Sequence, residues 1–191
     1  MNIIIHRGTK EVGGSCIEIK CKDSCVLVDF GLPLSFDFND EHDDINSVLP
    51  QPLYSNIVKG NKKIDALLLS HAHLDHYGLI GKLPKEIPVY MGEATSKLIR
   101  FTDEFTPNKI GIINPVTFKA HETFRIGSFE ITPYSVDHSA FDSYAFLFTG
   151  DNKSIFYSGD FRGHGHEHER FYNLVSNPPK VDVLLMEGTL L

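Results

Sequence analysis

The chain has 191 residues, of which 41% are hydrophobic and 23% are charged, a mixture that is typical of a globular protein and excludes a disordered tail. Eighteen Lys and Arg against 25 Asp and Glu give a net charge of −7, which excludes nucleic-acid binding through a general positive charge but allows a local phosphodiester site. Apolar runs such as those at residues 66–69 and 183–186 are far shorter than the roughly 20 residues that span a bilayer, so we expect no membrane interaction.

The cysteines and the N-terminus indicate a reducing compartment. Cys16, Cys21 and Cys25 are odd in number and have no CxxC spacing, which argues against a disulfide framework and a structural zinc knuckle. We expect them to be small core residues. Only three consecutive apolar residues precede His6 and Arg7, too few for the apolar region of a signal peptide, so we expect a cytoplasmic protein.

The first third of the chain predicts short strands separated by loops. Apolar and alternating segments at residues 3–6, 15–20 and 25–30 are typical of three successive strands of a meander. The acidic residues 33–52 show no period and predict a surface loop with at most one helical turn. The continuous apolar run at residues 64–70 predicts a strand that is buried on both faces.

The rest of the chain alternates between short helices and strands. We expect helices at residues 77–83, 93–104 and 167–176, and strands at 88–91, 115–119, 129–136, 144–148, 154–158 and 181–186. Early strands followed by this alternation favour an α/β architecture, in which a layered sheet is covered by helices on the outside.

The strongest chemical signal follows the strand expected at residues 64–70. His71, His73, Asp75 and His76 place four metal-capable side chains within six residues. In extended or turn geometry His71 and His73 point the same way, because their spacing is two. Imidazole nitrogens suit zinc, and a neighbouring carboxylate supports a second ion. A polar loop with incidental histidines would not concentrate ligands in this way.

This HAHLDH segment, followed by Gly78, resembles the HxHxDH signature of the metallo-β-lactamase fold. Three further residues match that family in the same chain order: Asp29 resembles its early strand-end aspartate, His138 its third histidine, and Asp160 the aspartate that bridges two metals. The resemblance implies an αβ/βα sandwich and covers the chain from about residue 3 to its end.

The subtype resembles ribonuclease J and the related β-CASP nucleases. The stretch from His138 to Ser143 is similar to the HSxxDS segment of that group, and Gly159 to Arg162 to its GDFK or GDFR segment. Glu187, which follows a strand in the sequence EGT, is similar to the group's EST or EGT triplet. The resemblance implies that Asp29 and Glu187 brace the metal ligands from behind.

One departure from that family concerns the second metal. The implied first site consists of His71, His73 and His138, and the second of Asp75, His76 and the shared Asp160. The family's last histidine ligand lies beyond the β-CASP domain, for which residues 1–191 have no position. We therefore expect an incomplete sandwich whose second site lacks one ligand. The chain ends at residues 188–191, directly after a strand, and we expect it to be the first part of a longer protein or to need a partner chain.

The resemblance implies hydrolysis of RNA or another phosphodiester by a metal-bound hydroxide. Two zinc ions, with manganese as the alternative, would lie about 3.5–4 Å apart and lower the pKa of a shared water. Asp75 and Asp160 would fix the bridging position. Three residues are candidates for phosphate contact: Ser139, Ser143 and Arg162.

Two other functions stay open. Small-molecule hydrolases of the same fold cleave thioesters or lactones without a β-CASP domain, and a catalytically inactive module would act only with a partner subunit. The alternating histidines His164, His166 and His168 favour a polar loop that leads into a helix, rather than a metal site.

Overall fold

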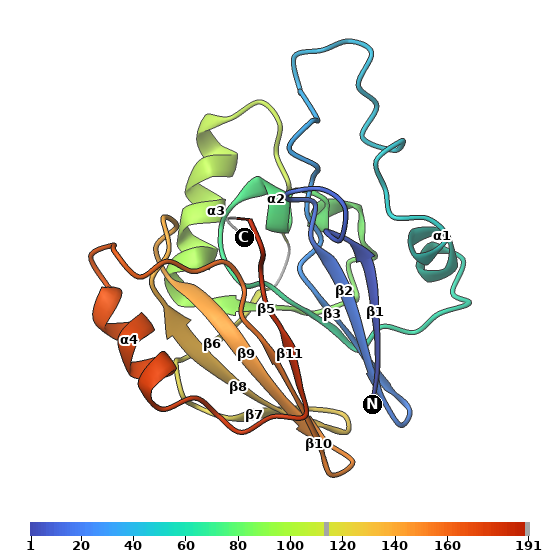
Figure 1. Ribbon diagram of the computed structural model, residues 1–191. Coiled ribbons are helices and arrows are strands. Elements are labelled where there is room, and N and C mark those ends of the chain that lie inside the picture. The colour runs from blue at the N-terminus through green and yellow to red at the C-terminus, as the bar shows by residue number, and fades with distance from the viewer. Residues whose placement is uncertain (113–114, 190–191) are drawn as a thin grey trace.

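The computed structural model describes residues 1–112 and 115–189, and residues 190 and 191 at the chain's end therefore lie outside the described part. Two sheets stack face to face (Figure 1). The first sheet has the strand order β1-β2-β3-β4-β5-β6 and the second β11-β10-β9-β8-β7. The strands of the first sheet are β1 (Asn2–Arg7), β2 (Cys16–Cys21), β3 (Ser24–Val28), β4 (Ala66–Leu68), β5 (Val89–Gly92) and β6 (Pro115–Phe118).

The second sheet contains β7 (Phe124–Ile126), β8 (Phe129–Val136), β9 (Ser143–Gly150), β10 (Lys153–Tyr157) and β11 (Val183–Leu185). The helices are α1 (Leu53–Val58), α2 (Leu74–Tyr77), the 3-10 turn η1 (Ile80–Lys82), α3 (Glu93–Phe105) and α4 (His168–Ser176). Among the described residues, no helix combines the length and the apolar character that crossing a membrane requires.

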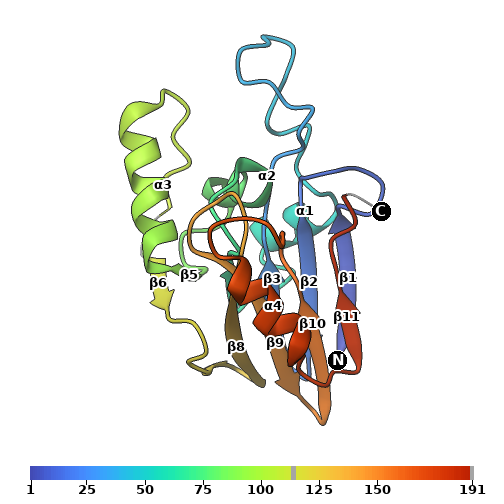
Figure 2. The ribbon, with the colours of Figure 1, turned by 60° about the vertical axis from the view of Figure 1, so that its left-hand side comes forward.

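Side chains along the central strands point alternately to the two faces of the sheet, and this produces the layers. In β4, Ala66 and Leu68 point toward the second sheet, whereas Leu67 packs with Leu53 and Ile57 of α1 on the opposite face. All three β4 residues are buried, as predicted for a strand that is covered on both sides. Figure 2 shows α4 over the outer face of the second sheet, where Leu174 packs against a small apolar cluster. The result is a helix–sheet–sheet–helix sandwich, which confirms the predicted fold class.

Most predicted elements are confirmed, including the three-stranded meander β1-β2-β3 and helix α3. The predicted helix at 77–83 was wrong in its limits. Helix α2 begins at Leu74 and ends at Tyr77, because Leu79 N–H turns away to donate to Phe30 O at 2.9 Å. Helix α1 and strand β7 were not predicted, since each is very short and depends on burial of a few side chains, such as Leu53 and Ile126.

The three cysteines are buried and free, which confirms their prediction as core residues. His6, which the sequence left unassigned, bonds through Nε2 to Glu18 Oε2 at 2.9 Å. Lys62 Nζ donates to the same carboxylate at 2.6 Å. Glu18 is only 3% exposed, so this cluster neutralises a buried charge on the outer side of β2.

Candidate metal centre

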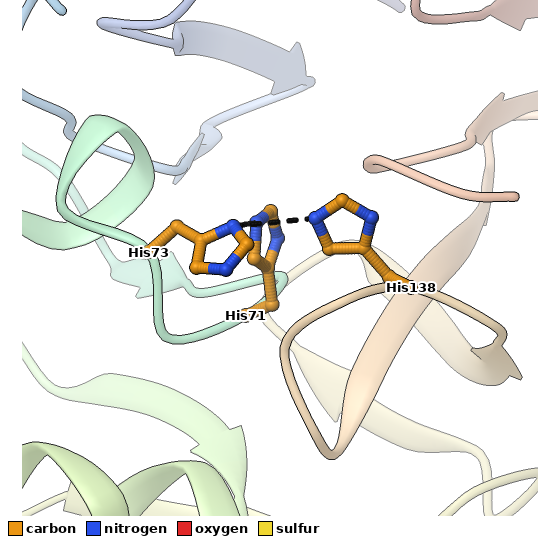
Figure 3. A group of neighbouring side chains, drawn as sticks. All are labelled: His71, His73 and His138. Carbon is orange, nitrogen blue, oxygen red and sulfur yellow. Dashed lines mark hydrogen bonds between the residues drawn. The ribbon is translucent and has the colours of Figure 1, made fainter. Parts of the chain in front are cut away.

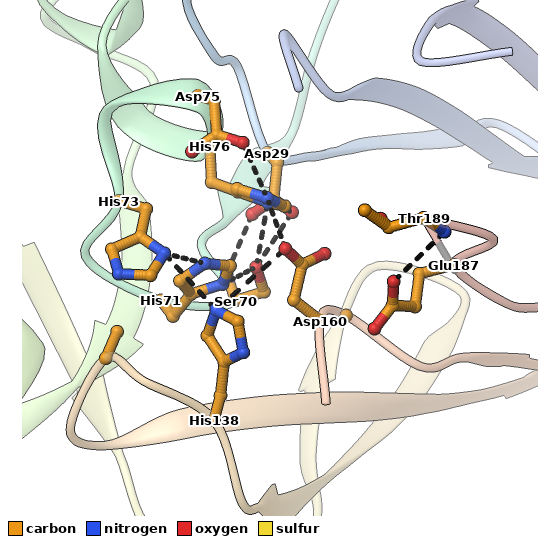
Figure 4. A network of polar contacts seen from close by, with 12 residues as sticks. Asp29, Ser70, His71, His73, Asp75, His76, His138, Asp160, Glu187 and Thr189 are labelled. Atoms are coloured by element: carbon orange, nitrogen blue, oxygen red, sulfur yellow. Dashed lines mark hydrogen bonds and ion pairs between the residues drawn. The ribbon is translucent and has the colours of Figure 1, made fainter. Parts of the chain in front are cut away.

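The candidate ligands lie on loops that follow the carboxyl ends of strands in both sheets. Strands β3 and β4 are parallel neighbours, so Asp29 and the loop of residues 69–76 emerge at the same edge. Strands β8 and β10 both pair antiparallel with β9 and therefore run in the same direction, which places His138 and Asp160 together. Figure 4 shows these loops converging from the two sheets.

The loop that carries the HAHLDH segment is held by backbone hydrogen bonds from neighbouring segments. Three N–H groups donate to its carbonyls: Ser15 to Asp75 at 3.0 Å, Phe30 to His76 at 2.8 Å and Leu32 to Leu74 at 3.0 Å. These bonds fix the loop without using any ligand side chain. The histidine and aspartate side chains therefore remain available for a ligand.

Three histidines form the first group of converging side chains (Figure 3). His73 Nδ1 lies 3.1 Å from His71 Nε2 and 3.2 Å from His138 Nε2. Tetrahedral zinc with Zn–N bonds of about 2.0–2.1 Å separates its nitrogen ligands by roughly 3.3 Å. These two spacings therefore fit a zinc ion, and the nitrogens of His71 and His138 lie within 4.8 Å of each other.

The histidines of this group favour the neutral form that metals bind. Burial lowers the pKa of His71 well below its usual range, and the neighbouring imidazoles of His76, His138 and His73 act in the same direction. Burial also lowers the pKa values of His73 and His138, against the raising effect of nearby carboxylates.

The second group joins His71, His76 and Asp160, whose ligand atoms all lie within 4.8 Å of one another. His76 Nε2 is 3.4 Å from Asp160 Oδ2 and 3.6 Å from Asp75 Oδ2. Asp160 Oδ2 is also 3.9 Å from His138 Nε2, so this carboxylate lies between the two groups. Asp75 approaches the second group at His76.

The charges around the second group suit a cation. Burial acts against protonation of His76, yet the carboxylates of Asp29 and Asp160 raise its pKa to about 10. Burial likewise opposes ionisation of Asp160, but the hydrogen bond and charge of His76 hold the pKa of Asp160 below its usual value. The surroundings of His76 Nε2 are therefore strongly negative, and the donor set of imidazoles and carboxylates fits zinc or manganese.

Comparison with known proteins places this architecture in a family. The model of the beta-lactamase superfamily domain matches residues 38–191. The chain belongs to the beta-lactamase superfamily. Its fold is that of the metallo-β-lactamases: the enzyme BJP-1 of Bradyrhizobium japonicum superposes with a TM-score of 0.63 over 92% of this chain and 71% of that one, at 17% identity.

Relatives in this superfamily include proteins named as ribonucleases. Ribonuclease J of Mycoplasma genitalium is 30% identical over 159 residues, 81% of this chain and 27% of that protein. The "Probable RNase MJ4" of Methanocaldococcus jannaschii is 27% identical over 210 residues, 99% of this chain and 45% of that protein. A protein of unknown function from Enterococcus faecalis has a TM-score of 0.77 at 26% identity, over 98% of this chain and 49% of that one. The chain thus spans less than half of the length of these curated relatives.

Asp29 and Glu187, the two residues expected to support the metal ligands, both contact the candidate site. Asp29 is fully buried, and its Oδ2 accepts a hydrogen bond from His76 Nδ1 at 2.8 Å. Glu187 Oε1 accepts from Phe161 N–H at 3.1 Å, next to Asp160 in the chain. Glu187 therefore contacts the loop that carries Asp160 rather than a histidine.

The three candidates for phosphate contact differ in their accessibility. Ser139 is exposed, and its Oγ lies 3.5 Å from His138 Nε2. Ser143 is 1% exposed and donates to Ala140 O at 2.8 Å, so its prediction as a substrate-binding residue was wrong. Arg162 Nε lies 3.4 Å from Asp137 Oδ1, which occupies one edge of its guanidinium group.

Sequence reasoning missed two buried groups next to the centre. Asp137, directly before His138, accepts a 2.6 Å hydrogen bond from Gly165 N–H and thereby ties the loop of His138 to the segment after Asp160. Tyr157 donates its hydroxyl to Asp29 at 2.7 Å. The position of Asp137 beside His138 was an available signal, whereas Tyr157 looks like any apolar strand residue. His164, His166 and His168 belong to neither ligand group among the described residues.

Proposed function

We propose that this chain carries the metal centre of a hydrolase that cleaves phosphodiesters, with RNA as the substrate class. The observation that carries the proposal is the pair of three-residue groups that share His71, with the Asp160 carboxylate between them. Two adjacent cation sites of this kind are typical of enzymes that hydrolyse phosphate esters. The likeness to proteins named as ribonucleases supports RNA over other phosphodiesters.

The described residues divide into two ligand sets. His71, His73 and His138 would hold the first ion, and His76, Asp160 and Asp75 the second. Zinc suits the imidazole-rich first set, and manganese is the alternative for the second set, which is richer in carboxylates. When bound, such ions supply a water of lowered pKa and positive charge for the phosphate oxygens.

The surface around Asp160 suits an extended substrate. A groove of about 660 Å³ reaches Asp160 from the side of Arg7 and Lys10, and its lining includes Asp75 and His76. A second groove of about 410 Å³ continues on the side of His138, Ser139 and Arg162. Both grooves include Asp160 and the segment of residues 186–189. A chain-like phosphodiester can therefore approach the candidate centre from either side, with the exposed Lys10 in the first groove and the exposed Ser139 in the second as groups that could contact it.

The experiment that tests this function compares three substrate classes on the metal-loaded chain. We expect turnover of bis-p-nitrophenyl phosphate and of a single-stranded oligoribonucleotide, and no turnover of a thioester or a lactone. Robust thioester or lactone hydrolysis without phosphodiester hydrolysis would assign the centre to a small-molecule hydrolase. Metal binding with no hydrolysis of any substrate would identify an inactive module that needs a partner.

A further inference from the structure

Ser70, the residue before the HAHLDH segment, bonds twice to Asp29. Its N–H donates to Asp29 Oδ1 at 2.8 Å, and its hydroxyl donates to Asp29 Oδ2 at 2.8 Å. Both residues are fully buried. The hydroxyl must be the donor in the second bond, because a carboxylate can only accept.

The direction of that bond determines the protonation of His71. Ser70 Oγ also lies 3.0 Å from His71 Nδ1. Since the single hydroxyl proton is used on Asp29, Ser70 Oγ accepts here, and His71 Nδ1 carries a hydrogen. The Nε2 lone pair of His71 is then free on the side of His73, 3.1 Å away. If the Ser70 hydroxyl instead donated to His71, the oxygens of Ser70 and Asp29 would lie 2.8 Å apart with no proton between them.

His76 bonds to the same carboxylate directly, and Ser70 Oγ is a longer second contact of its Nδ1 at 3.3 Å. Its Nδ1 donates to Asp29 Oδ2 at 2.8 Å, which leaves Nε2 directed toward Asp160 and Asp75 (Figure 4). Asp29 therefore reaches one histidine of each ligand group: His76 directly, and His71 through the Ser70 hydroxyl.

Tyr157 completes the surroundings of Asp29. Its hydroxyl donates to Oδ2 at 2.7 Å, so the carboxylate accepts four hydrogen bonds, three of them at one oxygen. Asp29 also has a φ of 57°, a left-handed conformation that non-glycine residues rarely adopt. Such a conformation persists where the surrounding contacts over-determine it, and it clusters at functional sites.

We propose that Ser70 and Tyr157 are positioning residues that act through Asp29, and that this unit couples the two metal sites. Ser70 transmits the effect of Asp29 to His71 of the first group, while Tyr157 holds the carboxylate for both groups. The inference rests on the proposed metal centre. It predicts that the two substitutions differ in which site they weaken.

Site-resolved zinc titration against a chromophoric chelator tests the inference on the full 191-residue chain. A His138→Ala variant, which lacks a ligand of the first group alone, assigns the two binding steps. Ser70→Ala should weaken the first site about 10–100-fold, the usual effect of losing a group that orients a ligand, and change the second site less than about threefold. Tyr157→Phe should weaken both sites together.

Tyr144→Phe is the matched control, because Tyr144 is also 7% exposed and donates its hydroxyl to a carboxylate, Asp142 Oδ1, at 2.6 Å. It should leave both affinities unchanged. Ser70→Thr, which keeps a hydroxyl, should restore the first site relative to Ser70→Ala. Equal weakening of both sites by Ser70→Ala, or equal effects of Tyr157→Phe and Tyr144→Phe, would overturn the proposal.

Nitrogen-15 spectra of the imidazole rings in the metal-free protein provide a readout that does not depend on metal or activity. We expect His71 to carry its proton on Nδ1 in the wild type and to lose that preference in Ser70→Ala, whereas the spectrum of His76, whose Nδ1 bonds to Asp29 directly, should not change. An unchanged His71 tautomer would contradict the relay. If the wild type binds no metal, the proposed function fails, but these spectra still decide whether Ser70 connects Asp29 to His71.

Discussion

Gly31 lies directly against the peptide carbonyl of Asp75: a Cβ atom at position 31 would stand 1.7 Å from that oxygen. The residues on either side of Gly31 donate hydrogen bonds to the same loop. The segment after β3 and the candidate metal loop thus touch through their backbones. Any side chain at position 31 would separate them and shift the ligands that the loop carries.

We therefore expect Gly31→Ala to destabilise the chain by about 3 kcal/mol or more and to reduce metal binding, because backbone atoms cannot move aside as a flexible side chain can. Gly60→Ala is the control, since nothing lies within 4 Å of its added Cβ and only its left-handed φ of 71° is strained. That strain should cost about 1–2 kcal/mol. Urea unfolding compares the two variants, and equal losses would contradict the steric argument.

His71 lies near both groups but is assigned to the first ion together with His73 and His138, so its removal should act on the first site. We expect His71→Ala and His73→Ala each to lose the first metal equivalent and to keep most of the second. His121→Ala, at an exposed histidine outside both groups, should bind as the wild type does. Elemental analysis after dialysis measures the metal content. Full occupancy in His71→Ala would refute the assignment of His71 to the first site.

Asp160→Asn should lower phosphodiester turnover more than about 100-fold. Losing a residue that only orients a ligand typically costs about 10–100-fold, and losing a direct ligand should cost more. The control variant is Asp182→Asn, which should retain activity. The Asp182 side chain is 42% exposed and pairs with Lys153 at 3.3 Å. Initial rates with bis-p-nitrophenyl phosphate decide the matter. Wild-type rates in Asp160→Asn would exclude a bridging role for this residue.

RNA should bind weakly to this chain. Its net charge of −7 provides no general attraction for phosphates, so we expect a dissociation constant weaker than about 10⁻⁴ M at physiological salt. Fluorescence anisotropy with a labelled single-stranded oligoribonucleotide measures the affinity at several salt concentrations. Micromolar binding with a steep salt dependence would show that a local basic surface dominates the net charge.

The buried Glu18 cluster should make stability depend on pH. Burial opposes ionisation of Glu18, but the hydrogen bonds from Lys62 and His6 hold its pKa below the usual value. A lowered pKa in the folded state stabilises the protein above the unfolded pKa of about 4.3, and this contribution disappears as the pH falls toward the folded value. The effect is therefore present at neutral pH and lost in acid.

We accordingly expect Glu18→Gln to cost about 1–3 kcal/mol at pH 7 and progressively less below about pH 4. Glu93→Gln is the control: Glu93 also pairs with a lysine, Lys97 at 2.7 Å, but its side chain is 69% exposed. Exposed pairs contribute about 0–1 kcal/mol, so this variant should behave almost as the wild type. A pH-independent loss in Glu18→Gln would rule out the ionic explanation.

The sequence by itself determined the local features of the protein. The buried strand β4 follows from an unbroken apolar run, because that pattern reports burial of neighbouring residues. Helix α3 was predicted within one residue of its bounds, although Leu98 and Phe105 of its expected apolar side are exposed. The HAHLDH segment concentrates ligands within a few residues, so it was recognisable without any contact information. Asp29, which precedes this segment, and His138 and Asp160, which follow it, could be picked out only through the resemblance to a family.

Only the tertiary structure decided which distant residues meet. Ser143 has the same residue type as Ser139 and lies only four positions after it, yet packing of β9 buries it and removes it from any substrate. Tyr157 and Asp29 lie 128 positions apart, and their hydrogen bond exists because β10 stacks over β3 in the sandwich. Such contacts depend on how the two sheets pack, and residue spacing along one chain carries no record of that packing.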